Sequence, residues 1–214
     1  MDTLAGILIK LPILLFSVIV HEVAHGWVAE RCGDPTARLA GRITLNPLPH
    51  IDPFMSILLP ALLLMSRSGI IFGGAKPVPV NPYYFRRPGR DEVFVSVAGI
   101  AANVGLALLF VVVARALIAA GWALDGAGRP TLPLYVCIMG VAINAMLAAF
   151  NLLPIPPLDG SHVLERVLPW AWRERYVALR SFGPILLILV LFLFGGLLSA
   201  YIGSVTDIFL RLVA

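Results

Sequence analysis

Two histidines and a glutamate in the first apolar run have the types and spacing of a catalytic metal site. The run contains H-E-x-x-H, with His21 and His25 four residues apart and Glu22 directly after the first histidine. Residues four apart project from one face of a helix, so both imidazoles can bind one zinc ion. The carboxylate beside the first ligand can act as a general base. Because ionisable groups in a bilayer-length helix are costly unless satisfied or functional, we favour a metal site over two buried structural histidines and a snorkelling glutamate.

A third protein ligand is expected, because catalytic zinc sites usually take three and leave one position open. Asp159 is the preferred candidate, since it follows a proline-rich turn after a later apolar run, on the same expected side of the membrane as the two histidines. His162 and His50 are the rival candidates. We therefore predict one zinc ion per chain, with Asp159 as its third ligand.

The composition is that of an integral membrane protein. Of the 214 residues, 59% are hydrophobic and only 13% are charged, whereas a soluble domain carries about 25% charged residues. The net charge of +4 does not indicate nucleic-acid binding, because the basic residues cluster in loops, as membrane topology requires. The first apolar run lacks a basic n-region and a small-residue cleavage site, so we expect it to be retained.

Five apolar stretches predict an all-α polytopic membrane protein. They comprise residues 4–29, 54–65, 93–120, 132–153 and 184–201. Four are long enough to span about 30 Å of hydrocarbon. A helix over 54–65 would reach only about 18 Å, and Pro60 interrupts it, so we expect this stretch to re-enter the membrane, with a fifth span as the alternative. We expect a single membrane domain over 1–214, with its core at about 4–160 and a C-terminal helix at 184–201.

The basic residues predict the orientation in the membrane. If 54–65 does not cross, twelve of them share one side, and only Arg129 and Arg211 lie clearly on the other. The twelve are Arg31, Arg38, Arg42, Arg67, Lys76, Arg86, Arg87, Arg90, Arg166, Arg173, Arg175 and Arg180. If 54–65 did cross, the division would be nine against five. Because basic residues are favoured on the cytoplasmic side, we expect the N-terminus outside and the H-E-x-x-H motif near the cytoplasmic face.

Three asparagines are candidates for binding the substrate or its oxyanion. Asn103 lies in an apolar stretch in which two pairs of small residues, Ala98 with Ala102 and Ala101 with Gly105, allow close helix packing. Asn144 and Asn151 are seven apart and share a face of a later helix. We expect Asn103 to hydrogen-bond the oxyanion or the substrate strand, with simple interhelical hydrogen bonding as the alternative.

The segment 72–82 is rich in glycine and proline, which exclude a helix. Val78, Pro79 and Val80 suit an extended, β-like edge on the cytoplasmic side. Such an edge could pair with an extended substrate by strand addition. An ordinary cytoplasmic turn is the alternative.

These motifs together resemble the site-2 protease family of intramembrane zinc metalloproteases. The resemblance is carried by H-E-x-x-H in the first helix and by N-x-x-P-x-x-x-x-D-G at 151–160, and it covers about 20–160. The small-residue helix with Asn103 and the glycine pair at 73–74 also match, and the segment 76–82 is similar to that of the compact subgroup without a PDZ domain. The chain departs from the family at Ile100, where a proline is usual.

The resemblance implies a metalloendopeptidase that hydrolyses peptide bonds of membrane-spanning or membrane-associated substrates near the cytoplasmic side of a bacterial or archaeal cell membrane. It implies that His21, His25 and Asp159 bind zinc and that Glu22 is the catalytic base. It also implies that Asn151 lies near the site, as does Asn103. The expected partners are a membrane-spanning protein and the lipid bilayer, without nucleic acid. A metal transporter and a catalytically silent membrane scaffold are the alternatives.

Overall fold

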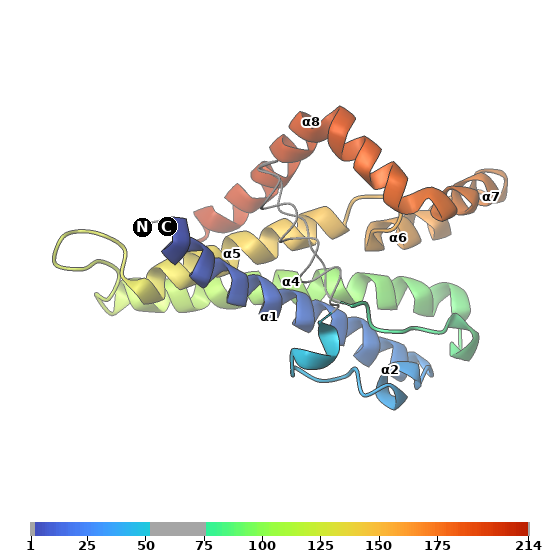
Figure 1. Cartoon of the computed structure of the whole chain (residues 1–214), viewed down its shortest axis with the longest axis horizontal. Coiled ribbons are helices and arrows are strands. Elements are labelled where there is room, and N and C mark those ends of the chain that lie inside the picture. The colour runs from blue at the N-terminus through green and yellow to red at the C-terminus, as the bar shows by residue number, and fades with distance from the viewer. Residues whose placement is uncertain (1–2, 52–75, 214) are drawn as a thin grey trace.

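A computed structural model describes residues 3–51 and 76–213, and this part of the chain is built from helices (Figure 1). In chain order these are α1 (Thr3–Cys32), α2 (Thr36–Leu39), η1 (Leu48–His50), η3 (Pro82–Tyr84), α4 (Pro88–Ala119), α5 (Leu132–Asn151), α6 (Asp159–Val167), α7 (Trp170–Leu179), η4 (Arg180–Phe182) and α8 (Gly183–Arg211). The described ranges contain no β-sheet, only an isolated bridge between Leu124 and Pro130. The predicted all-α class is confirmed.

Four helical segments of the described ranges are long and apolar enough to cross a membrane. They are Gly6–Cys32, Pro88–Ala119, Leu132–Asn151 and Trp170–Arg211. They match four of the five predicted apolar stretches. The fifth stretch, 54–65, lies outside the described residues, and so does the glycine pair at 73–74.

The long helices pack around α4 (Figure 1). One side of α4 lies against α1 and another against α5, which also packs against α8. A buried apolar cluster joins Val111 and Ala114 of α4 to Leu134 and Val141 of α5 and to Val213 after α8. Close packing in lipid depends on such small and well-fitted side chains, since burial from water contributes little there.

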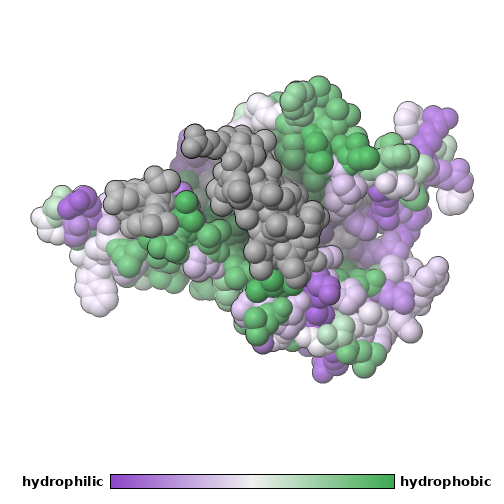
Figure 2. Space-filling view, in the orientation of Figure 1, coloured by the Kyte–Doolittle hydropathy of each residue, from purple (hydrophilic) through white to green (hydrophobic). Residues whose placement is uncertain are grey.

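The outer surface of the helices is apolar and their ends at α6 and α7 are polar. Phe192 of α8 is 86% exposed and Val112 of α4 is 65% exposed. In Figure 2, hydrophobic residues cover the bend of α8, which occurs at Phe194, and hydrophilic residues gather near α6 and α7. This division is expected for helices whose sides face lipid and whose ends reach water.

Of the two small-residue pairs predicted to pack closely, Ala98 and Ala102 are half-buried, whereas the prediction is wrong for Ala101 and Gly105. Ala101 and Gly105 are exposed, and a Cβ added to Gly105 would have no neighbour within 4 Å among the described residues. The helix α4 instead turns the face that carries Gly99 and Asn103 towards α1. The sequence pattern showed a stripe of small residues but did not show which side of the helix faces its neighbour.

Candidate metal centre

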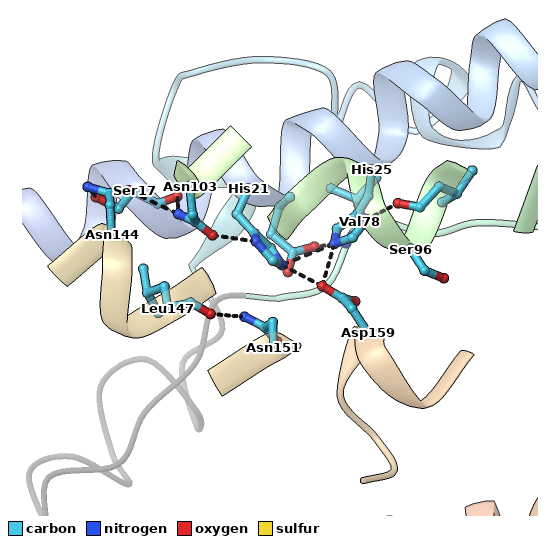
Figure 3. Close-up of polar contacts among 12 residues, drawn as sticks. Ser17, His21, His25, Val78, Ser96, Asn103, Asn144, Leu147, Asn151 and Asp159 are labelled. Carbon is cyan, nitrogen blue, oxygen red and sulfur yellow. Dashed lines mark hydrogen bonds and ion pairs between the residues drawn. The ribbon is translucent and has the colours of Figure 1, made fainter. Parts of the chain in front are cut away.

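Three ligand atoms converge where α1 meets α6 (Figure 3). The Nε2 atoms of His21 and His25 lie 3.0 Å apart. Asp159 Oδ2 lies 3.2 Å from the first and 3.3 Å from the second. The histidines come from neighbouring turns of one helix, whereas Asp159 is the first residue of α6. Among the described residues, these three form the cluster that could hold a metal ion.

Hydrogen bonds fix both imidazole rings from behind. His21 Nδ1 lies 2.7 Å from Asn103 Oδ1, and His25 Nδ1 lies 2.7 Å from the Val95 carbonyl oxygen. Asn103 Nδ2 donates to Asn144 Oδ1 at 3.0 Å, which turns the Asn103 oxygen towards His21. Because both ring partners are acceptors, each Nδ1 carries the proton and each Nε2 presents its lone pair to the centre.

The donor set fits zinc. Two nitrogen lone pairs and a carboxylate oxygen face one another at 3.0–3.3 Å, an arrangement that is repulsive without a cation. Ligands about 2.0–2.1 Å from a tetrahedral zinc ion are about 3.4 Å apart, close to these separations. Asp159 Oδ2 is buried and accepts no other hydrogen bond from the described residues.

The Asp159 carboxyl is ionised. Burial raises its pKa, but in the metal-free protein a proton held at Nε2 of His21 or His25, in the place of the zinc ion, outweighs burial and holds the pKa below the ordinary value. The helix dipole acts in the same direction, because Asp159 lies in the first turn of α6. The charge that a zinc ligand needs is therefore present.

Gly99 allows α4 to approach the two histidines. A Cβ added at this position would lie 2.5 Å from His21 Cε1 and 2.7 Å from His21 Nδ1, and it would overlap His25 Nε2. Any side chain would therefore displace one ring or move the helix. Sequence reasoning missed this residue, although its position four before Asn103 places both on one helical face.

Glu22 faces the same cavity as the three ligands but does not belong to their cluster. Its Oε2 accepts a hydrogen bond from the Val78 N–H at 2.8 Å. Val78 in turn packs on Gly26, where an added Cβ would lie 2.9 Å from Val78 Cγ1. The segment 76–81 thus orients a carboxylate that can accept a proton beside the metal ligands.

The cavity around the centre has a volume of about 530 Å³ and a mixed lining. One part is apolar and includes Val78, Val80, Phe85 and Val95. The other part is charged and includes Glu92, Glu165, Arg166, Arg173 and Arg180. A polar approach of this kind admits water to a site between apolar helices, as hydrolysis requires.

Comparison with known proteins identifies the family. The sequence model of Peptidase family M50 matches residues 127–196. The chain is 38% identical to "Putative zinc metalloprotease YwhC" of Bacillus subtilis (strain 168) over 179 residues, which cover 84% of this chain and 77% of that protein. The chain belongs to peptidase family M50. The predicted resemblance to site-2 proteases is thereby confirmed.

Other relatives agree with the assignment to peptidase family M50. Over 200 residues, the chain is 32% identical to "Putative zinc metalloprotease Rip2" of Mycobacterium tuberculosis (strain ATCC 25618 / H37Rv), covering 91% of this chain and 70% of that protein. It is 38% identical to "Putative zinc metalloprotease MJ0611" of Methanocaldococcus jannaschii over 104 residues, 47% of each chain. No solved structure matches significantly. This member of the family is a metalloendopeptidase and an integral membrane protein.

The three candidate asparagines occupy two different places in this peptidase (Figure 3). Asn103 and Asn144 are fully buried, and Asn144 Nδ2 donates to Ser17 Oγ at 2.9 Å. They form a network between α1, α4 and α5 behind His21, and their position does not favour the expected contact with an oxyanion. Asn151 instead lines the cavity, with its amide donating to the Leu147 carbonyl at 3.1 Å.

The two rival ligands lie apart from the metal cluster. His162 lines the cavity, but its Nδ1 lies 2.7 Å from Arg180 Nη2. Burial and the Arg180 guanidinium lower the pKa of His162, so it is neutral at pH 7. His50 is fully buried, and its Nε2 lies 2.8 Å from the Thr44 carbonyl oxygen.

Of the residues expected to form a substrate strand, Val78 and Val80 line the cavity, and the segment belongs to no strand. Arg42 donates to the Lys76 carbonyl and, at 3.3 Å, to the Pro77 carbonyl. Val78 donates its backbone N–H to Glu22, and Pro79 has no backbone N–H. Pairing with a substrate through this segment would therefore rely on Val80 and on the carbonyl groups.

Proposed function

We propose that the chain is a zinc-dependent intramembrane endopeptidase that cleaves membrane-spanning or membrane-associated proteins near the cytoplasmic face. The observation that carries this proposal is that Glu22 faces one cavity with three converging ligand atoms. That cavity lies among helices able to span a membrane. A single zinc ion would be held by His21, His25 and Asp159. The distances between their two Nε2 atoms and the Oδ2 atom, and the lone pairs that these atoms turn towards one another, support this assignment.

The chain's own residues supply proton transfer and orientation. Bound zinc provides a Lewis acid for the scissile carbonyl and lowers the pKa of water towards about 7. Glu22 accepts the proton of the attacking water and passes it to the leaving nitrogen. The Val78 N–H orients the Glu22 carboxylate at 2.8 Å. Asn103 and the Val95 carbonyl hold the histidine rings with their lone pairs towards the centre.

The substrate would bind in an extended form. A membrane-spanning helix uses its carbonyl groups in its own hydrogen bonds, so the scissile bond must lie where the helix is unwound. The cavity offers apolar surface from Val78, Val80 and Val95, and Asn151 adds a polar side chain to its lining. Strand addition along 78–80 would align such a segment beside Glu22.

Basic residues support a cytoplasmic position for the site. The C-terminus of α1, the N-terminus of α4 and both α6 and α7 lie at one end of the bundle (Figure 1). The described basic residues at this end are Arg31, Arg38, Arg42, Lys76, Arg86, Arg87, Arg90, Arg166, Arg173, Arg175 and Arg180. Since basic loops stay on the cytoplasmic side, this end would face the cytoplasm.

Reconstitution with single-span proteins tests the proposal. We expect cleavage inside the apolar segment of a substrate, near its cytoplasmic end, when the product termini are read by mass spectrometry. A zinc chelator should abolish the cleavage and added zinc should restore it. Cuts confined to the soluble tails of every substrate would contradict intramembrane hydrolysis.

A further inference from the structure

The helix that carries the third ligand begins in close contact with the end of α5. A Cβ added to Gly160 would lie 2.6 Å from the Leu152 carbonyl carbon and 2.7 Å from the Leu153 carbonyl oxygen. This contact fixes where α6 starts but not the direction of its axis. Direction matters, because rotation about the first turn would move the Asp159 side chain relative to the histidines.

Further along α6, Arg166 forms an ion pair with Glu92 of α4. Arg166 Nε donates to Glu92 Oε2 at 2.9 Å, and Arg166 Nη2 donates to the same oxygen. The two side chains are only 22% and 24% exposed, and both line the cavity of the metal centre. A directed pair of this kind constrains geometry more than a fully exposed ion pair does.

Equal spacing on the two helices aligns this ion pair with the metal centre. On α6, Arg166 follows Asp159 by seven residues, and on α4, Gly99 follows Glu92 by seven. Seven residues are about two turns, so each pair shares a helical face. The two helices therefore meet at two levels, one at the metal ligands and one at the ion pair.

The residue before Arg166 joins α6 to α7 and η4. Glu165 is buried, accepts a hydrogen bond from Arg173 Nη2 at 3.2 Å and pairs with Arg180. These contacts tie α6 to α7 and η4, whereas the ion pair between Arg166 and Glu92 ties it to α4. The ion pair between Glu92 and Arg166 is the polar contact that the structure shows between these two helices among the described residues.

We propose that Glu92 and Arg166 are positioning residues that hold Asp159 at the metal ion. This inference rests on the proposed function, because it takes Asp159 as a zinc ligand. Substitution of residues that orient a metal ligand lowers metal affinity about 10- to 100-fold. The ion pair acts through a helix rather than on the carboxylate itself, so the lower end of that range, about tenfold, is expected.

Zinc affinity, measured by competition with a chelator on purified protein, tests the role of the pair. Glu92→Gln and Arg166→Gln should each bind zinc about tenfold more weakly than wild type. The exchanged pair, Glu92→Arg with Arg166→Glu, should recover most of the lost zinc affinity. It restores an ion pair between the two positions, and the effects of substitutions at contacting residues are not additive. Arg129→Gln is the matched control, because it removes an exposed ion pair with Asp125 far from α6 and should not change zinc affinity.

Thermal unfolding of the metal-free proteins separates positioning from a general structural role. A structural role alone would lower the unfolding temperature of the single variants and leave the zinc affinity of the folded protein at the wild-type value, which would overturn the proposal. An exchanged pair that binds zinc as weakly as the single variants would overturn it as well. If Arg166→Gln does not fold, Glu92→Gln carries the test, and wild-type zinc affinity in that variant would contradict the positioning role.

Failure of the underlying metal site would be seen separately. His21→Ala and Asp159→Ala are measured in the same competition assay. If both bind zinc as wild type does, the assignment of the site is wrong, whatever the ion pair does. If they lose zinc and the ion-pair variants keep it, only the positioning role is wrong.

Discussion

Gly99 of α4 lies against the ring of His25 so closely that a methyl group at position 99 would overlap His25 Nε2. The same methyl group would lie 2.5 Å from His21 Cε1. The helix α1 carries the two proposed histidine ligands and α4 carries their hydrogen-bond partners, so the two helices approach each other at a point where only glycine fits. The geometry of the centre depends on this contact as much as on the ligands.

Gly99→Ala should lower zinc affinity about 100-fold, because one imidazole must leave its position or α4 must move away. Gly105→Ala on the same helix is the matched control, since its Cβ would meet no described residue within 4 Å. That variant should keep zinc and gain slightly in stability, because alanine is the better helix former. Chelator competition on both variants checks the prediction, and equal zinc affinities would contradict it.

Substitution of the ligands should abolish stoichiometric metal. We expect about one zinc per chain in the wild type, as a three-ligand site requires, and little in His21→Ala, His25→Ala or Asp159→Ala. His162→Ala should keep its zinc, because His162 is engaged by Arg180 outside the cluster. Elemental analysis of purified protein gives the answer. Full zinc in Asp159→Ala together with loss of zinc in His162→Ala would show that His162, and not Asp159, is the third ligand.

The asparagines should separate into two kinds of variant. Asn103→Ala removes the acceptor of the His21 Nδ1 proton, so zinc affinity should fall about 10- to 100-fold. Asn151→Ala should keep zinc and lower kcat/KM for a protein substrate, because Asn151 lines the cavity. Zinc binding and cleavage measured on the same preparations distinguish them. Equal loss of zinc in both variants would show that Asn151 also supports the metal.

Orientation in the membrane can be tested with single cysteines. In a background without Cys32 and Cys137, a cysteine at position 86 or 173 should react with an impermeant reagent from the cytoplasmic side only. A cysteine at position 129 should react from the opposite side only. These results follow from the asymmetry of basic residues. If the cysteine at position 86 reacts only from outside, the orientation is the reverse of the predicted one.

Much of this arrangement could be predicted from the sequence because the signals were local. The spacing of His21 and His25 follows from helical periodicity, and the apolar stretches predicted the four long helices. Asp159 could be selected because proline-rich turns end helices and because the charges placed it on the side of the histidines.

The remaining features depend on contacts between distant parts of the chain. The hydrogen bond from Val78 to Glu22 joins residues with no shared local pattern. The face that α4 turns towards α1 was also unpredictable, since its apolar residues surround the helix and give no preferred side. An oxyanion role was expected for Asn103 because the sequence did not show that this side chain is buried behind His21.

The most direct test of the account compares wild type with Glu22→Gln in two assays, zinc content and cleavage of a single-span substrate. Glutamine has nearly the shape of glutamate and can still accept the Val78 N–H, but it cannot accept the proton of water. We predict unchanged zinc, an unchanged fold and turnover lower by at least about 10²-fold, the range that general-base catalysis contributes. Cleavage by Glu22→Gln at close to the wild-type rate would contradict the central claim that Glu22 is the base of a zinc peptidase.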